Sequence, residues 1–197
     1  LALTLPAAIA MLVVPAPIVN ILYERGAFTS ETTALTASAL AAFASGLPAY
    51  VLIKVFQPAF FAREDMKTPL WFSMATVAVN VVLSFVLFGR YGHVAIALAT
   101  SLSAWVNALL LGITLWSRRH YRPDAKNLRK TLMILVSAAA MGAFLYIAGG
   151  LLAAFLSSPS TLTRVVSTLG LLLGAFVLYM AVVITTGGLD WQELRGA

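Results

Sequence analysis

Hydrophobic and polar positions form long blocks along this chain, in which six apolar stretches are separated by short polar segments. Each stretch is close to or above the ~20 residues that a helix needs to cross a bilayer core. Backbone groups surrounded by lipid must bond to one another, so such stretches form helices and not strands. We therefore expect an all-α, polytopic bundle of six transmembrane helices, covering roughly Leu3–Tyr23, Leu35–Phe61, Leu70–Phe88, Val94–Trp116, Leu132–Phe155 and Val165–Thr185.

Charged residues are scarce and mostly lie outside these stretches. They make up 10% of the chain, compared with roughly 25% in a typical soluble domain. A net charge of +6 would suggest nucleic-acid binding in a soluble protein, but here the basic residues lie in short loops, so no nucleic-acid partner is expected. Cysteine is absent, and the two histidines, His93 and His120, fall in opposite loops. Thiol chemistry and an acid–base or metal cluster are therefore not expected.

The loops also predict the orientation of the chain. The side that holds the turn after the second stretch, the loop after the fourth and the tail carries nine basic residues: Arg63, Lys67, Arg118, Arg119, Arg122, Lys126, Arg129, Lys130 and Arg195. The opposite side carries only Arg25, Arg90 and Arg164. Because basic loops stay in the cytosol, we expect the nine-residue side and the C-terminus to be cytosolic.

The first apolar stretch begins at Leu1 without a methionine, a basic leader or a cleavage site. It is therefore not interpreted as a signal peptide, and we expect the chain to be the C-terminal part of a longer protein. Transporters built from repeated halves place the substrate between the halves. On this interpretation the other half of the binding site lies in a preceding lobe of the same protein.

Polar residues follow one face of two of the stretches. These polar residues are spaced three or four positions apart, which places them on one face of a helix. They are Ser73, Thr76, Asn80 and Ser84 in the third stretch and Thr100, Ser103 and Asn107 in the fourth. Such residues can hydrogen-bond across helix contacts, each worth only about 0.6 kcal/mol, or they can line a polar cavity. Both interpretations place these two faces inside the bundle.

The second stretch contains the one basic residue that lies within a predicted span, Lys54, with Gln57 one turn later. Gly46, Pro48 and Pro58 should bend this helix. A lysine at the centre of a span is disfavoured by roughly 3 kcal/mol, so it needs a cavity, a partner or an escape route. Lys54 can extend its ammonium group towards the cytosolic interface, or it can contact an anion in a central cavity, where its three donors suit a phosphate.

Two charged segments lie at the ends of the spans. Glu24 and Arg25 lie at the end of the first stretch. They form either a helix end followed by a turn or an outer gate pair. The second segment, a cytosolic turn, is either a solvated loop that fixes topology or a gate, and consists of Arg63, Glu64, Asp65 and Lys67.

Several long segments resemble the MurJ (MviN) lipid II flippase family of the MOP flippase superfamily. They match in order along the whole chain and read LYERGAFT at 22–29, GLP at 46–48, KV at 54–55, PAFFARED at 58–65, KTP at 67–69, GH at 92–93 and LATSLSAWVN at 98–107. The resemblance implies a fourteen-helix transporter of the bacterial inner membrane, of which these are the ninth to fourteenth helices. It divides the chain into residues 1–127, four helices of the second lobe with a basic cytosolic loop, and residues 128–197, two additional helices and a cytosolic tail.

The resemblance implies translocation of lipid II, a peptidoglycan precursor, by alternating access. The two additional helices would hold its undecaprenyl tail, and the arginines that hold its pyrophosphate would lie on earlier helices, outside this chain. Partners would be lipid II, membrane lipids and the missing N-terminal lobe. The expected cavity residues in this chain are Lys54, Gln57, Ser73, Thr76, Asn80, Thr100, Ser103 and Asn107.

No cofactor is expected, and transport would be coupled to a sodium ion or to the membrane potential. By resemblance, sodium ligands would be Asn80, Ser84, the Ile96 carbonyl and Thr100. Ser84 stands where a carboxylate is expected and neutral oxygens hold sodium weakly, which argues against the site. The rival functions are a flippase for another undecaprenyl-linked glycan, a MATE-like exporter, a polyprenyl-phosphate transferase and a structural scaffold for cell-wall assembly.

Overall fold

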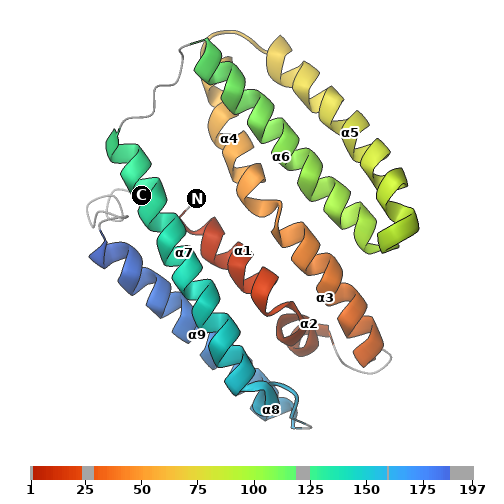
Figure 1. Ribbon diagram of the computed structural model, residues 1–197, viewed down its shortest axis with the longest axis vertical. Coiled ribbons are helices and arrows are strands. Elements are labelled where there is room, and N and C mark those ends of the chain that lie inside the picture. The colour runs from red at the N-terminus through yellow and green to blue at the C-terminus, as the bar shows by residue number, and fades with distance from the viewer. Residues whose placement is uncertain (1, 24–28, 119–124, 159, 187–197) are drawn as a thin grey trace. The chain divides into compact units, whose positions relative to one another are not determined.

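The computed structural model describes residues 2–23, 29–118, 125–158 and 160–186, and its regular structure in these ranges is entirely helical (Figure 1). The helices are α1 (Thr4–Val13), α2 (Pro15–Tyr23), α3 (Ser30–Ala44), α4 (Leu47–Phe61), α5 (Lys67–Tyr91), α6 (Val94–Ser117), α7 (Ala125–Leu151), α8 (Ala153–Leu156) and α9 (Thr161–Thr185). The prediction of an all-α membrane bundle is confirmed.

The six predicted spans are recovered with one change. Among the described residues, five segments are long and apolar enough to cross a membrane by themselves, with α3 and α4 together forming one of them. The first predicted span is instead the pair α1 and α2, which are bent by 88° at Val14. Pro15 and Pro17 follow the break, and neither has an N–H with which to continue the helical ladder.

The described residues divide into two compact units, one of residues 39–118 and one of residues 2–23, 29–38, 125–158 and 160–186. In the first unit α6 is central, with α4 on one side and the antiparallel α5 on the other (Figure 1). Small residues of α6, Ala104 and Ala108, pack against Ala49 of α4, while Leu111 and Leu115 enclose Phe60. Small residues let helices approach closely where no hydrophobic effect drives them together.

The break between α3 and α4 is stabilised by α6. The Gly46 N–H donates to the Phe43 carbonyl, which takes it out of the α-helical ladder. The Ser101 hydroxyl donates to the Ala42 carbonyl at 2.6 Å, and the Trp105 indole donates to the Ser45 carbonyl at 2.9 Å. Carbonyls released by a break inside a membrane need such partners. A bend was expected at Gly46, and the helix is interrupted there, whereas Pro58 lies inside α4 without ending it.

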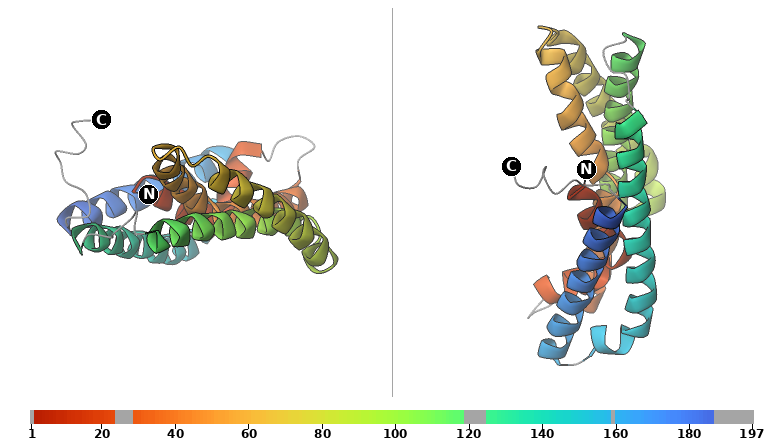
Figure 2. Two further views of the ribbon diagram at one scale, coloured as in Figure 1. Left: turned by 90° about the horizontal axis from the view of Figure 1, so that it is seen from above. Right: turned by 90° about the vertical axis from the view of Figure 1, so that its left-hand side faces the viewer.

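The second unit packs the broken first span against the last two long helices, which run side by side in both views of Figure 2. Its core includes Leu145 and Tyr179, and the Tyr179 hydroxyl donates to the Ala2 carbonyl at 2.6 Å. Ile9 of α1 would lie only 3.3 Å from a Cβ added at Gly142 of α7, so this glycine permits the close approach. The division at residue 127 concerns the lobes of a complete transporter and stays a prediction.

Candidate functional site

A hydrogen-bonded polar seam, formed by Asn80, Thr100 and Ser103, joins α5 to α6. The Asn80 amide nitrogen donates to the hydroxyls of Thr100 and Ser103, at 3.2 Å each. Thr100 donates its own proton to the Ile96 carbonyl at 2.8 Å, and Ser103 donates to the Thr100 carbonyl at 2.9 Å. Each hydroxyl proton therefore points at the α6 backbone, which leaves the oxygen lone pairs for Asn80. The seam is a helix contact in this structure.

The other predicted stripe residues do not join the polar seam. The Thr76 hydroxyl donates to the Phe72 carbonyl of its own helix at 2.7 Å, and Ser73 and Ser84 are half-buried on α5. Asn107 is only 7% exposed, and its side-chain oxygen has no hydrogen-bond partner among the described residues. Leaving a buried acceptor unsatisfied costs about 1–3 kcal/mol. Asn107 therefore favours the cavity interpretation, whereas Asn80 is already used for packing.

Lys54 lies on the face of α4 that does not pack on α6. Ala49 and Ile53 contact α6, whereas Lys54 is exposed and Gln57 is half-buried. Within the described part of the chain, Lys54 makes no hydrogen bond or ion pair. Its ammonium group is therefore available to a ligand, to another part of the protein or to the interface, and its place in a cavity stays a prediction.

The sodium ligands inferred from the resemblance are only partly brought together. Thr100 connects Asn80 to the Ile96 carbonyl, but it does so by hydrogen bonds that a bound cation would have to replace. Every donor in the set, Ser84 included, is uncharged, and no group of three or more His, Cys, Asp or Glu residues occurs among the residues described. Sodium binding stays a prediction for which the donor set is weak.

The turn between α4 and α5, which the basic residues predict to be cytosolic, is a tightly bonded corner. The Glu64 N–H donates to the Phe61 carbonyl at 3.0 Å and the Asp65 N–H to the Phe60 carbonyl at 3.1 Å, which is the bonding of a Schellman cap. Glu64 takes the left-handed position of that cap, with φ +58°. The side chain of Asp65 then begins α5, where it accepts the Thr68 N–H at 3.0 Å and the Thr68 hydroxyl at 2.7 Å.

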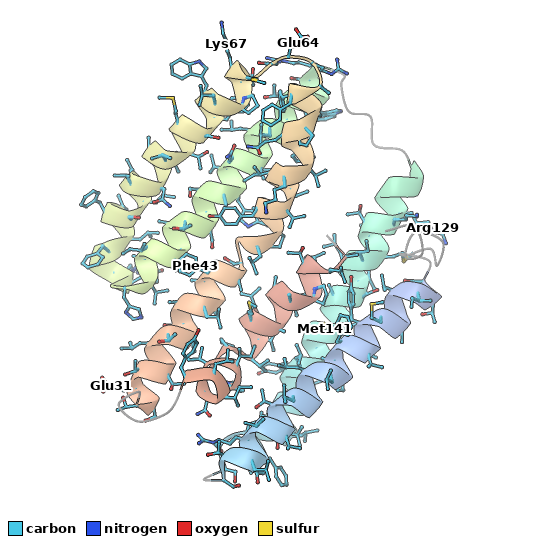
Figure 3. All side chains as sticks on the ribbon, turned by 180° about the vertical axis from the view of Figure 1, so that it is seen from behind. Glu31, Phe43, Glu64, Lys67, Arg129 and Met141 are labelled. Atoms are coloured by element: carbon cyan, nitrogen blue, oxygen red, sulfur yellow. The ribbon has the colours of Figure 1, made fainter. Side chains whose placement is uncertain are left out.

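Arg118 ties this corner to the end of α6. Its guanidinium forms an ion pair with Asp65 at 2.6 Å and also donates to the Thr68 hydroxyl at 3.4 Å. The hydrogen bonds from Thr68, followed by the one from Arg118, lower the pKa of Asp65 from 3.8 to about 2. Asp65 thus forms hydrogen bonds at the end of α4, the start of α5 and the end of α6. The other charged residues of the turn, Arg63, Glu64 and Lys67, are exposed; Glu64 and Lys67 are labelled in Figure 3.

Replacing Asp65 by asparagine is expected to lower the melting temperature of the full-length protein at pH 7. Because the folded pKa of Asp65 lies below its ordinary value, its stabilisation is complete above pH 3.8 and is lost as the pH falls towards 2. The difference in melting temperature between wild type and variant should therefore be the same at pH 7 and pH 5. Glu64→Gln, which removes an exposed carboxylate of the same turn, is the control. A gap between wild type and Asp65→Asn that closes above pH 5 would contradict the assignment.

The two proposed outer gate residues, Glu24 and Arg25, lie outside the described residues. Sequence reasoning also missed several side chains that the structure uses. Ser101 and Trp105 stabilise the helix break, and Arg118 was counted only as a topology signal. The spacing of Asp65 and Thr68 is that of a helix N-cap and could have been recognised. No local pattern reveals the others, because their partners are remote in the sequence.

Three comparisons place this chain among known proteins. The family described as Lipid II flippase MurJ matches residues 1–184. The chain belongs to the MurJ family. A probable lipid II flippase MurJ of Rhizobium meliloti (strain 1021) is 45% identical over 98% of this chain and 36% of its own length, and one of Rhizobium tropici is 44% identical over the same shares.

A solved structure, lipid II flippase MurJ in an inward closed conformation, superposes with a TM-score of 0.72 at 23% identity, over 98% of this chain and 37% of its own. That likeness supports the MurJ fold. The chain thus spans about a third of the length of the MurJ relatives it matches. With its apolar helices, it is a segment of a multi-pass membrane protein.

Proposed function

We propose that the complete protein is a flippase that moves lipid II from the inner to the outer leaflet of the bacterial cytoplasmic membrane. The family match over residues 1–184 carries this proposal, supported by relatives that are 45% and 44% identical over nearly the whole chain. Alternating access between two lobes would expose the substrate to one side of the membrane at a time. No covalent step is needed.

The described segment would contribute one wall of the transport cavity. The exposed Lys54 suits a phosphate of the substrate, because its ammonium group lacks a protein partner within the described residues and carries three donors. Asn107, whose buried oxygen is unsatisfied, would contribute a polar group further along α6. The helices α7 and α9 would contact the lipid tail, and either sodium or the membrane potential would drive the cycle.

The test is complementation by the full-length gene in a strain depleted of its own lipid II flippase. We expect restored growth and restored lipid II on the outer leaflet, measured by its accessibility to an enzyme added outside spheroplasts. Growth without lipid II exposure would contradict the proposal and favour another undecaprenyl-linked glycan. Transport of an exporter substrate by the protein, without lipid II exposure, would favour the MATE-like alternative.

The orientation can be tested separately, since the chain has no native cysteine. We expect Ser160→Cys in the full-length protein to react with a membrane-impermeant thiol reagent in intact cells and Met66→Cys to react only after lysis. Both side chains are exposed in the structure, so burial does not explain a difference between them. The expectation follows from the excess of basic residues on the side of Met66. Reaction of Met66→Cys in intact cells would show that the orientation is reversed.

A further inference from the structure

An apolar pocket of about 850 Å³ lies within the second unit, beside the bend of the first span. Four elements form it: the bend between α1 and α2, the first turn of α3, the end of α7, and α8. No residue of α9 lines this bend pocket, so it is distinct from a groove between α7 and α9. Its volume falls within the roughly 300–1,000 Å³ that is typical of small-molecule sites.

The bend pocket exists because the sequence removes both backbone continuity and side-chain bulk there. Pro15 and Pro17 have no N–H, so the helix breaks and the second half turns away by 88°. Gly149 and Gly150 of α7 line the opposite wall, and a Cβ added at Gly150 would meet no atom within 4 Å.

Polar residues form the rim of the bend pocket, and the Arg164 guanidinium is bonded to one of them, Asn20. The polar groups of the lining are Asn20, Ser30, Thr33, Ser157 and the hydroxyl of Tyr146, and the remaining lining residues are apolar or glycine. The Arg164 guanidinium donates to the Asn20 side-chain oxygen at 3.0 Å, which places a positive charge next to the rim. Among the described residues that line the pocket none is a carboxylate, and Glu31 is exposed in the first turn of α3. The arrangement matches an amphiphile that has an apolar chain and an anionic head.

We propose that the bend pocket binds one acyl chain of a glycerophospholipid from the surrounding membrane, with its phosphate at Asn20 and Arg164. An acyl chain fills an apolar pocket that is lined by glycine and alanine, and a guanidinium pairs with phosphate through directed hydrogen bonds. The bound lipid would fill the space beside the bend and support the bent conformation of the first span. This role is separate from transport of lipid II.

The experiment uses the purified full-length protein and a phosphatidylglycerol that carries a diazirine in its acyl chain. We expect cross-links in the peptide that covers residues 145–157. Gly150→Phe, which places a ring in the open space of the pocket, should reduce them about tenfold, corresponding to a loss of about 1.4 kcal/mol. The matched control is Gly170→Phe on α9, where an added Cβ also meets nothing within 4 Å but which does not line the bend pocket. Ala153→Phe serves as a second pocket variant should Gly150→Phe fail to fold.

A second probe, a diacylglycerol with the same diazirine, separates binding of the lipid phosphate from binding of the acyl chain, because it lacks the phosphate. Arg164→Gln should reduce labelling by the phosphatidylglycerol probe and leave labelling by diacylglycerol unchanged. Equal loss for both probes would overturn the assignment of the phosphate to Arg164. Unchanged labelling in Gly150→Phe, the absence of labelling in wild type, or competition by a polyprenyl phosphate but not by phospholipid would each overturn the proposed acyl-chain site.

Discussion

Replacing Gly46 by alanine is expected to destabilise the full-length protein by about 2–3 kcal/mol, near the upper end of typical overpacking. A Cβ at this position would lie 2.7 Å from the Ser101 hydroxyl oxygen and 2.9 Å from the Ser101 Cα. The hydroxyl could rotate away, but the Cα belongs to the backbone of α6. Relief would require α6 to move from the break, and the bonds of Ser101 and Trp105 to that break would weaken.

The measurement is thermal unfolding of the purified full-length protein in detergent, followed by loss of the monodisperse peak. Gly89→Ala is the matched control, because an added Cβ on this exposed position of α5 meets nothing within 4 Å. Alanine is favoured over glycine in helices by about 1 kcal/mol, so Gly89→Ala should be neutral or stabilising. Equal melting temperatures for Gly46→Ala and Gly89→Ala would contradict the close packing of α6 on the break.

Replacing Lys54 by methionine is expected to lower lipid II translocation by at least about tenfold without a matching loss of folded protein. A hydrogen bond to a charged group contributes about 1.5–3 kcal/mol, and methionine keeps the length of the side chain while removing all three donors. Because Lys54 is exposed on α4 and makes no bond within the described residues, its removal leaves no buried partner unsatisfied. The cost should therefore appear in transport.

Translocation and the amount of monodisperse protein are measured for the same preparations. Arg129→Met removes one positive charge from an exposed position at the start of α7 and controls for net charge and topology. Lys54→Arg, which keeps a cation there, should retain more transport than Lys54→Met. Parallel losses of protein and transport in Lys54→Met would instead favour a lysine that anchors α4 at the cytosolic interface.

The membrane-spanning helices were predictable because lipid leaves the backbone few choices. A long apolar stretch must be helical, so the pattern located every long helix, although α7 begins at Ala125 and not at Leu132, and the fifth predicted span runs past the end of α7 into α8. The interruption of the second span near Gly46 was also predictable, since glycine and proline act locally on the backbone. The pattern indicated bending in the first span through its prolines, but it did not give the 88° break at Val14.

The candidate site was less predictable. The sequence placed polar stripes at helical spacing on α5 and α6, and the antiparallel pairing of these helices brings Asn80 to Thr100 and Ser103. Spacing could not show that Asn80 is satisfied while the Asn107 oxygen is not. Whether a polar side chain is used for packing or left for a ligand depends on the partner helix.

The sequence by itself determined the helical membrane class, the order and approximate limits of the spans, and the resemblance to the MurJ family, because each depends on local composition or on matching motifs. Only the tertiary structure decided that Asp65, Thr68 and Arg118 form one corner, that α6 satisfies the break beside Gly46, and that a pocket lies beside the bend of the first span. These features join residues far apart in the chain. Their energies come from direct contact, and a pattern along one helix contains no information about the atoms that a neighbouring helix places against it.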